Sequence, residues 1–364
     1  MARIDAFLKL GREQGCTDVH FAVGMPPLLR NLGDLTPIKY RDLTDQELES
    51  LLFEILDDRQ KADFDNGRDI DFAYQSDEVG RFRVSLFRKV TGVGAAFRLV
   101  NTEIPSLAEL GMPPAIEKFI DAHQGLVLVT GATGTGKSTT LASMLNLLNR
   151  TRRLNIITLE DPIEHVHYSQ KSLVVQREVG THVDTFANGL RAALREDPDV
   201  ILVGELRDPE TIMMAMTAAE TGHLVLGTLH TTSATKTLDR IIDATPTEQK
   251  AQASNFLAQH LRGVISQKLV KTPDGRGRKA VVEVFINTPA IANLINTGKI
   301  YQIPSILQTG RDKGMQTMDQ ALLEALQNKT IDPDDAYLHA TNKQQFQRFV
   351  TDPDLLPQID LAVN

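Results

Sequence analysis

The chain has 364 residues, 41% hydrophobic and 24% charged, which is typical of a globular protein with room for two or three domains. Its formal net charge of -8 argues against a general nucleic-acid-binding surface, and its single cysteine, Cys16, excludes an internal disulfide. One cysteine also cannot build a zinc site without several other ligands. No apolar run approaches the roughly 20 residues of a membrane span. No signal pattern opens the chain, so we expect a cytosolic protein that reaches a membrane only through a partner.

Residues 1–101 are predicted to form a small α+β domain. A helix is expected around Leu48–Ile55 with Thr44 or Asp45 as its N-cap, because apolar residues recur there at helical spacing. Short apolar runs around turn signals predict strands. These strands are expected at residues 17–23, 28–32, 69–74, 81–89 and 94–100.

Apolar and basic residues alternate in the run at 81–89, where Phe82, Val84 and Leu86 alternate with Arg81, Arg83 and Ser85. Alternation of this kind packs one face of a strand and leaves the other face to the guanidinium groups. Two interpretations stay open. This face is either a solvated one, or it carries arginines (Arg81, Arg83 or the nearby Arg98) that reach phosphate, including phosphate on a neighbouring subunit.

Residues 102–114, which contain three prolines, are predicted to be a linker into a second domain. Residues 115–288 then alternate helices with apolar strands, which is the signature of a mostly parallel sheet covered on both faces. The strands are expected at 126–129, 155–159, 200–203 and 224–229. Polar or acidic residues follow each strand, at the edge where open α/β sheets bind their ligands.

The run at 131–138 follows the first of these strands and opens a helix, which is the context of a P-loop. Its glycines allow a tight loop whose backbone N–H groups point at a triphosphate, and Lys137 reaches the β- and γ-phosphates. The Ser138 hydroxyl is expected to bind Mg²⁺. We therefore predict a nucleoside triphosphate and Mg²⁺ as ligands, with nucleotide contacts from Gly131, Thr133, Gly134, Thr135, Gly136, Lys137, Ser138 and Thr139.

Three carboxylates, Glu160, Asp161 and Glu164, follow the second strand. They could hold Mg²⁺ through water or position the attacking water, and a nucleotide metal needs carboxylates at this edge. The alternative is a solvated loop with Pro162 as a turn residue. We assign Glu160 and Glu164 to the catalytic group and Glu160, with Ser138, to the metal.

The third strand ends in Gly204 and Glu205 and resembles a Walker B strand, although Gly204 stands where an aspartate would bind Mg²⁺. Glu205 is thus predicted to orient or deprotonate the attacking water, against the alternative of an ordinary strand-end acid. His230 follows the fourth strand at the same edge, where it could sense the γ-phosphate. The alternative for His230 is a histidine that only stabilises the fold.

A long helix is expected at 247–270, followed by a hairpin-like turn at 274–277 and a strand at 280–286. Residues 289–364 are predicted to be a C-terminal helical region that packs on the ATPase core or meets a partner. The last part, 344–364, is weakly patterned and is expected to fray.

The assembled motifs resemble the secretion-superfamily ATPases, and specifically the PilT type that retracts type IV pili. The resemblance covers nearly the whole chain. It includes the P-loop, the acidic box at 158–164, the run at 197–205, the histidine box at 221–233, and terminal motifs at 17–20, 25–30, 300–305 and 314–319.

The resemblance implies a PAS-like N-terminal domain, a RecA-like ATPase domain and a homohexamer with nucleotide between the domains. It implies that Arg81, Arg83 and Arg98 contact nucleotide and that Glu205 is the catalytic acid. It further implies that ATP hydrolysis drives pilus retraction, and hence twitching motility, through an inner-membrane platform protein. The chain would then be cytoplasmic and peripheral at the inner membrane, with no nucleic-acid partner.

One segment departs from the PilT pattern. PilT proteins carry Ala-Ile-Arg-Asn-Leu-Ile-Arg-Glu, and here Ala292, Asn296 and Thr297 replace both arginines and the glutamate. The alternatives that stay open are an accessory PilT paralogue, an ATPase of a related secretion system, and a nucleotide switch that does not hydrolyse ATP. Assembly-type and type II secretion ATPases usually carry a four-cysteine zinc motif, which one cysteine cannot supply.

Overall fold

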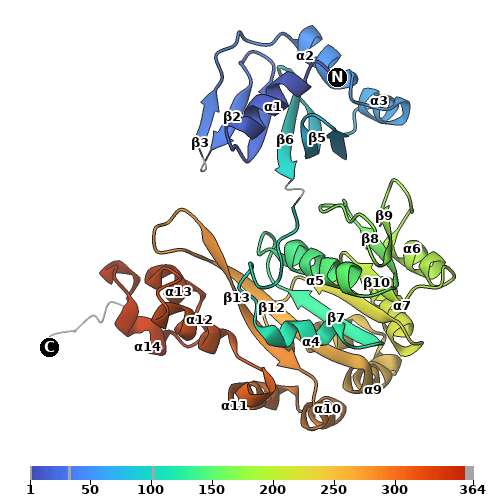
Figure 1. Ribbon diagram of the computed structural model, residues 1–364, viewed down its shortest axis with the longest axis vertical. Helices are drawn as coiled ribbons and strands as arrows, with labels where there is room; N and C mark the ends of the chain where they lie inside the picture. The colour runs from blue at the N-terminus through green and yellow to red at the C-terminus, as the bar shows by residue number, and fades with distance from the viewer. Residues whose placement is uncertain (1, 32–33, 101–102, 357–364) are drawn as a thin grey trace. The chain divides into compact units, whose positions relative to one another are not determined.

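The computed structural model describes residues 2–31, 34–100 and 103–356 (Figure 1). The expected strand end at residue 32, the domain boundary at 101–102 and the final part of the stretch at 344–364 lie outside the described residues. The chain divides into two compact units, Met1–Glu103 with Pro162–Val166, and Ile104–Asp161 with His167–Asn364.

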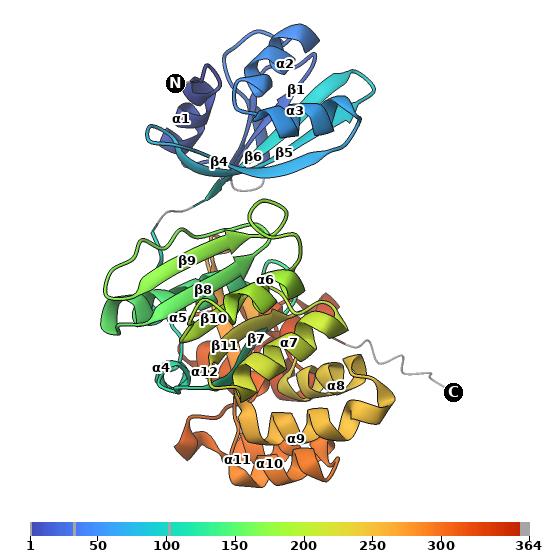
Figure 2. The same cartoon turned by 90° about the vertical axis from the view of Figure 1, so that its right-hand side faces the viewer.

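The first unit is an antiparallel six-stranded sheet in the order β3-β2-β1-β6-β5-β4, with helices packed on one face (Figure 2). Its strands are β1 (Asp18–Ala22), β2 (Leu28–Asn31), β3 (Asp34–Pro37), β4 (Ile70–Ser76), β5 (Gly80–Lys89) and β6 (Gly92–Val100). Its helices are α1 (Asp5–Glu13), α2 (Asp45–Phe53) and α3 (Asp58–Asp65). The predicted strands and the α2 helix are confirmed, with Thr44 as N-cap, whereas α1, α3 and β3 were not predicted.

Alternation along β5 is also confirmed. Phe82, Val84 and Leu86 are buried in the core beneath the helices. Arg83 and Arg98 are directly opposite each other on β5 and β6, and both side chains are exposed on the other face.

The second unit is built on a seven-stranded sheet in the order β13-β12-β7-β11-β10-β8-β9, in which every neighbouring pair except β12–β13 is parallel. The strands are β7 (Gly125–Thr130), β8 (Asn155–Glu160), β9 (Leu173–Glu178), β10 (Val200–Val203), β11 (Leu224–Leu229), β12 (Leu261–Lys271) and β13 (Arg278–Ile286). The four predicted parallel strands are confirmed. Alternate residues of β7 enter two different cores, so both faces of this sheet are covered.

Helices α4 (Glu117–Ile120) and α5 (Lys137–Thr151) cover one face. The other face is covered by α6 (Phe186–Ala193), α7 (Pro209–Glu220), α8 (Ala234–Ala244) and α9 (Lys250–His260). Leu107 and Met112, from the predicted linker, are buried against α4 and so contribute to the packing of this unit.

The predicted long helix at 247–270 is wrong. Helix α9 ends at His260, and the chain continues directly into β12, which fills the place between β7 and β13. Helical spacing of apolar residues continues past His260, but Val264 and Ile265 are β-branched and are buried on opposite faces of the sheet. The pairing with β7, distant in sequence, overrides the local pattern.

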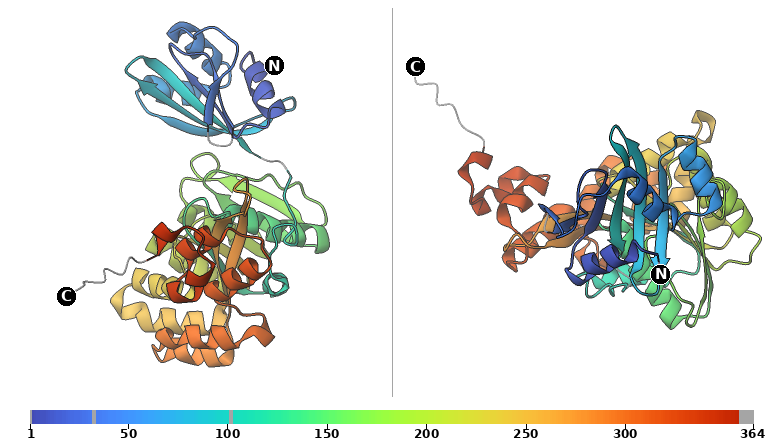
Figure 3. Two further views of the ribbon diagram at one scale, coloured as in Figure 1. Left: turned by 90° about the vertical axis from the view of Figure 1, so that its left-hand side faces the viewer. Right: turned by 90° about the horizontal axis from the view of Figure 1, so that it is seen from above.

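The C-terminal region is helical, as predicted. It contains α10 (Pro289–Asn296), α11 (Ile303–Thr309), α12 (Met318–Gln327), α13 (Pro333–His339) and α14 (Lys343–Phe346). Helices α12–α14 lie together beside the β12–β13 hairpin, and their core includes Val270 and Val281 of that hairpin (Figure 3). Within the described residues, no helix is long and apolar enough to cross a membrane.

Candidate nucleotide-hydrolysis site

The P-loop joins the end of β7 to the start of α5, as the sequence predicts. Gly134 and Gly136 have φ of 77° and 85°, a conformation that side chains with a Cβ rarely adopt. Lys137 is buried, and its Nζ donates to the carbonyl oxygens of Gly131 at 2.9 Å and Ala132 at 3.0 Å. The lysine therefore lies folded back over the loop that it belongs to.

The other predicted nucleotide contacts lie along this loop and the first turn of α5. Thr133, Gly134 and Ser138 are exposed, whereas Thr135, Gly136 and Thr139 are half-buried. The Thr135 hydroxyl donates to the carbonyl of Ala132 at 2.8 Å, which closes the loop on itself. The free backbone N–H groups at the start of a helix give such a loop its affinity for anions.

Gln267, on β12, holds the P-loop through two side-chain hydrogen bonds. The sequence pattern did not predict this residue as part of the site. Its side-chain amide donates to the carbonyl of Thr135 at 2.7 Å and accepts from the Thr140 hydroxyl at 2.8 Å. A Cβ on Gly131 would lie 2.4 Å from the Gln267 carbonyl oxygen, so only glycine permits this approach of β12 to the loop. Because the sequence predicts a helix at residues 247–270, it does not place Gln267 on a strand beside the P-loop.

Glu205 lies just after β10, and its carboxylate has partners on both oxygens. Arg207 Nε is 2.7 Å from Oε2, and His230 Nε2 is 3.1 Å from Oε1. The side chain of Glu205 is 18% exposed, so solvent still reaches it. The structure thus brings together the two residues that the sequence singled out after β10 and β11, and adds Arg207 to them.

Gly204 stands where a Walker B aspartate is expected, and packing explains why no side chain is present. A Cβ at this position would lie 3.1 Å from the Leu159 carbonyl oxygen and 3.3 Å from the Glu160 Cα on β8. Its backbone instead accepts a hydrogen bond from the Thr228 hydroxyl. The close approach of β8 and β10 therefore disfavours an aspartate there.

Glu160 ends β8, at the same edge of the sheet as the P-loop, Glu205 and His230. Its Oε1 accepts from the Thr158 hydroxyl at 2.6 Å and from the side-chain amide of Gln176, on β9, at 3.0 Å. The carboxylate is half-buried. These two hydrogen bonds hold the Glu160 carboxylate at the sheet edge.

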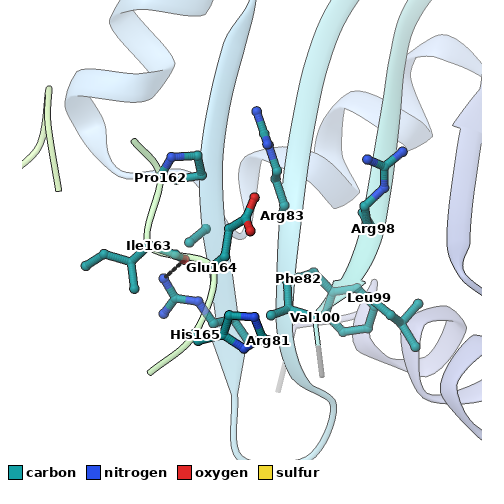
Figure 4. Close-up of a pocket in the computed structure, with 11 residues that line it drawn as sticks. Arg81, Phe82, Arg83, Arg98, Leu99, Val100, Pro162, Ile163, Glu164 and His165 are labelled. Atoms are coloured by element: carbon teal, nitrogen blue, oxygen red, sulfur yellow. Dashed lines mark hydrogen bonds between the residues drawn. The ribbon is translucent and has the colours of Figure 1, made fainter. Parts of the chain in front are cut away.

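Glu164 is part of the first unit and not of the unit that carries the P-loop. It belongs to the segment Pro162–Val166, which packs with the first unit and lines a pocket there with Arg81, Arg83 and Arg98 (Figure 4). Arg81 Nη2 donates to the carbonyl of Ile163 at 2.9 Å. Burial lowers the pKa of His165 in the same segment, although the charge of Glu164 opposes this. This pocket is cationic, which suits an anionic ligand.

Asp18, a second residue that the sequence reasoning missed, orients Arg98. It lies opposite Arg98 on the neighbouring strand β1, and its Oδ1 accepts from Arg98 Nε at 2.9 Å. The side chain of Asp18 is 10% exposed and that of Arg98 is 70% exposed. The buried carboxylate thus holds the inner edge of the guanidinium, and the outer edge faces solvent.

Among the residues that the structure describes, no three His, Cys, Asp or Glu side chains converge on a metal site. A nucleotide metal would be held at the P-loop by Ser138, with Glu160 at the same sheet edge. The donor set fits, because a hydroxyl, a carboxylate and phosphate oxygens are the hard ligands that Mg²⁺ prefers.

Comparison with known proteins gives a match to the family model of the type II/IV secretion system proteins over residues 64–332. The chain belongs to this family. It is 50% identical to the type IV pilus retraction ATPase PilT of Pseudomonas aeruginosa, over 88% of this chain and 92% of that protein. It is 48% identical to a twitching motility protein of Neisseria gonorrhoeae, over 87% of this chain and 85% of that protein.

A solved structure of the pilus retraction motor PilT with bound ADP is similar to this secretion ATPase, with a TM-score of 0.89 and 40% identity. The match covers 96% of this chain and 99% of that one. The predicted fold class, an N-terminal PAS-like α+β domain followed by a RecA-like P-loop ATPase domain with a C-terminal helical extension, is confirmed. So is the resemblance to the PilT type.

Proposed function

We propose that this secretion ATPase is a homohexameric motor that hydrolyses ATP and drives type IV pilus retraction, and hence twitching motility. The observation that supports this most is the 50% identity to a PilT retraction ATPase over nearly the full length of both chains. The P-loop, Glu205 and His230 all lie at the carboxyl edge of one sheet, which supports hydrolysis rather than nucleotide binding alone.

ATP would bind with its phosphates on the N–H groups of the P-loop. Lys137 would exchange its two carbonyl partners for the β- and γ-phosphates, which is a short movement of a flexible side chain. Ser138 and Glu160 would hold Mg²⁺, which when bound neutralises phosphate charge. Gly131, Thr133, Gly134, Thr135, Gly136 and Thr139 complete the proposed nucleotide contacts.

Glu205 would then take a proton from the attacking water or orient it. Its carboxylate is paired with Arg207 and His230, so the attacking water would use a lone pair that these partners leave or would displace one of them. His230 is suited to control access to the carboxylate because it contacts Glu205 from the end of the neighbouring strand β11.

We propose that four residues of the first unit take part in catalysis at a nucleotide bound in the ring. These are Arg81, Arg83, Arg98 and Glu164. Two exposed guanidinium groups side by side, one of them oriented by Asp18, can stabilise the charge that spreads over a transferring phosphoryl group. The domains we propose are 1–101, the linker 102–114, the ATPase core 115–288 and the helical region 289–364.

The proposed setting is the cytoplasmic side of the inner membrane, where a platform protein of the pilus machinery would receive the force. We propose no nucleic-acid partner, in line with the net charge of -8. The direct test is to delete the gene in its source cell and to count surface pili, with complementation by the parent and by Glu205→Gln. Excess pili that only the active protein returns to normal are expected. Bald cells would instead mean that the protein drives extension.

An accessory PilT paralogue is the second candidate, and α10 is the observation that favours it. The buried residues Ile291 and Ile295 hold this helix in place, while Asn296 and Thr297 are exposed and Ala292 is half-buried. The replaced PilT positions therefore change the surface chemistry of α10 without changing its packing. Unchanged pilus numbers after deletion, with ATPase activity intact in the purified protein, would support this candidate over the first.

A further inference from the structure

Glu283 on β13 is a buried carboxylate that lies beside the first residues of two helices, α8 and α12. Its side chain is within the core of the second unit, and the residue is only 9% exposed. Oε1 accepts from the backbone N–H of Ala234, the first residue of α8, at 2.8 Å. The backbone N–H of Met318, the first residue of α12, faces the same carboxylate and acts to lower its pKa.

The surroundings of Glu283 favour its charge only in part. Burial raises its pKa, whereas the N–H groups of Ala234 and Met318 and the charge of Lys268 on β12 lower it, and Asp319 on α12 raises it again. The first turns of α8 and α12 add the positive ends of two helix dipoles. A buried carboxylate in this position is costly unless these contacts are made.

On the α8 side, the contact fixes the loop that carries His230. Three residues separate His230 from Ala234, and this short loop is itself attached to α8. The Thr231 and Thr237 hydroxyls are 2.7 Å apart, the Thr237 hydroxyl donates to the Ser233 carbonyl at 2.8 Å, and Lys236 Nζ donates to the Thr232 hydroxyl at 3.2 Å. The loop therefore moves with the start of α8.

On the α12 side, the contact is to an element that is bound to the sheet. Gln316, two residues before α12, exchanges two backbone hydrogen bonds with Val284 at 2.9 and 3.1 Å, and its side chain donates to the Val282 carbonyl at 2.8 Å. Helix α12 lies beside β13 (Figure 1). Met318 and Leu322 of this helix share a buried core with Val281 of β13. The start of α12 is therefore a fixed point of the C-terminal region.

We propose that Glu283 is a positioning residue that holds the His230 loop in place for hydrolysis and ties the movement of this loop to the C-terminal helices α12–α14. The inference rests on the proposed hydrolysis at Glu205, which His230 contacts at 3.1 Å. A change in the partners of Glu205 shifts the loop and α8, and the carboxylate passes that shift to α12.

The test uses the full-length protein with Glu283→Gln, which keeps the shape but turns one accepting oxygen into a donor facing a backbone N–H. We expect kcat to fall about tenfold with KM within about twofold, because a hydrogen bond to a charged group is lost and the P-loop is not touched. Glu324→Gln, an exposed carboxylate on α12, is the matched control. An unchanged kcat for Glu283→Gln overturns the proposal.

Ala234→Pro is a second variant that removes the donor itself. Proline is favoured at the first position of a helix, and Ser233 before it is extended, with φ of -158° and ψ of 161°. We expect the same fall in kcat as for Glu283→Gln. A normal kcat in this variant contradicts the proposal even where Glu283→Gln fails to fold.

Hydrogen exchange separates coupling from simple structural support. With ADP added to the parent, we expect altered exchange both in the 230–238 peptide and in the 316–322 peptide. In Glu283→Gln, the second response is lost and the first remains. Equal responses in both proteins, or no response at 316–322 in the parent, would overturn the coupling. This measurement does not require ATP hydrolysis. If the parent binds ADP but does not hydrolyse ATP, the proposed function is contradicted, and the coupling can still be tested by hydrogen exchange.

Discussion

The P-loop region of the second unit and the arginine-bearing sheet face of the first differ in how far their charges are satisfied. Lys137 is buried and donates to two carbonyl groups, and Glu205 has a partner on each oxygen. Arg83 is exposed, and Arg98 is held by Asp18 along its Nε edge. The charged groups of the P-loop region are paired within their own unit. The guanidinium groups of the arginine face present N–H donors to solvent.

This difference suggests two kinds of contribution to one reaction. The first region can bind nucleotide with residues of its own unit. On the arginine face, Asp18 already orients Arg98. The remaining N–H groups of these arginines would contribute binding free energy when an anion binds to them. The predictions below test this division of labour, first at the arginine face and then within the P-loop.

The largest effect is expected for Arg83→Ala. If this arginine acts on the transferring phosphoryl group, kcat falls about 100- to 1,000-fold while ATP binding changes little, as for other catalytic arginines. Arg88→Ala, at an arginine of the same strand whose ring contact and ion pairs are with α2 and α3, is the control. Steady-state hydrolysis and ATP titration together measure the two quantities.

Mixing Arg83→Ala with Glu205→Gln sharpens this prediction. Each inactive protein supplies the group that the other lacks, so an arginine that acts on a neighbouring subunit gives partial recovery of hydrolysis in the mixture. No recovery would mean that Arg83 serves the nucleotide of its own subunit or plays no part.

Lys137→Ala should weaken ATP binding about 10- to 100-fold, since a charge-assisted contact to the phosphates is lost. The carbonyl groups of Gly131 and Ala132 also lose their partner, which loosens the loop. Isothermal titration against the parent measures the change, with Lys171→Ala, at an exposed lysine, as control. Equal affinities would contradict the P-loop assignment.

Gln267→Leu should weaken ATP binding about three- to tenfold, because the amide that supports Thr135 and Thr140 is replaced by an apolar side chain of similar size. Ser266→Ala is the control, since that hydroxyl bonds to Thr130 of β7 and not to the loop. An affinity equal to that of the control would show that the loop holds its shape without β12.

The smallest effect is expected for Asp18→Asn, about 0.5–1 kcal/mol of stability near neutral pH, as for a partly exposed ion pair. Burial acts to raise the pKa of Asp18, but the hydrogen bonds from Arg98 and Thr17 outweigh it and lower the pKa below its ordinary value of 3.8. A carboxyl group with a lowered pKa contributes stability above its ordinary value and loses it as pH falls through the folded-state pKa.

Urea unfolding of parent and Asp18→Asn should therefore differ near pH 7, and the difference should shrink as the pH falls below the ordinary value of 3.8 and through the lowered pKa of Asp18. A difference that stays constant across this range would mean that the charge of Asp18 is not the source of the stability.

The sequence predicted the parts of the fold that depend on local pattern. Alternation in β5, the apolar strand β10 and the N-cap of α2 are each visible within a few residues. Strand β12 was missed because its stability comes from pairing with β7, more than a hundred positions earlier in the chain, and helical spacing in α9 ran on into it. The spacing of apolar residues within a segment does not reveal its pairing with a strand that is distant in sequence.

The site divides in the same way. Lys137, Glu205 and His230 were found because each follows an apolar strand of a parallel sheet, and such strands end at a common edge. Gln267 and Asp18 could not be found this way, since each acts across strands: Gln267 on a loop carried by β7, and Asp18 on Arg98 of β6. Their roles need the register of the sheets.

The most direct test of the account is Glu205→Gln in the full-length protein, with ATP binding and ATP hydrolysis measured on the same preparation. We predict binding within about twofold of the parent and hydrolysis at least about 100-fold slower, because the group that accepts the proton of the attacking water is lost. Glu210→Gln, at an exposed carboxylate on α7, should match the parent in both. Hydrolysis at the parent rate in Glu205→Gln would contradict the assignment of Glu205, and with it the proposed motor chemistry of this site.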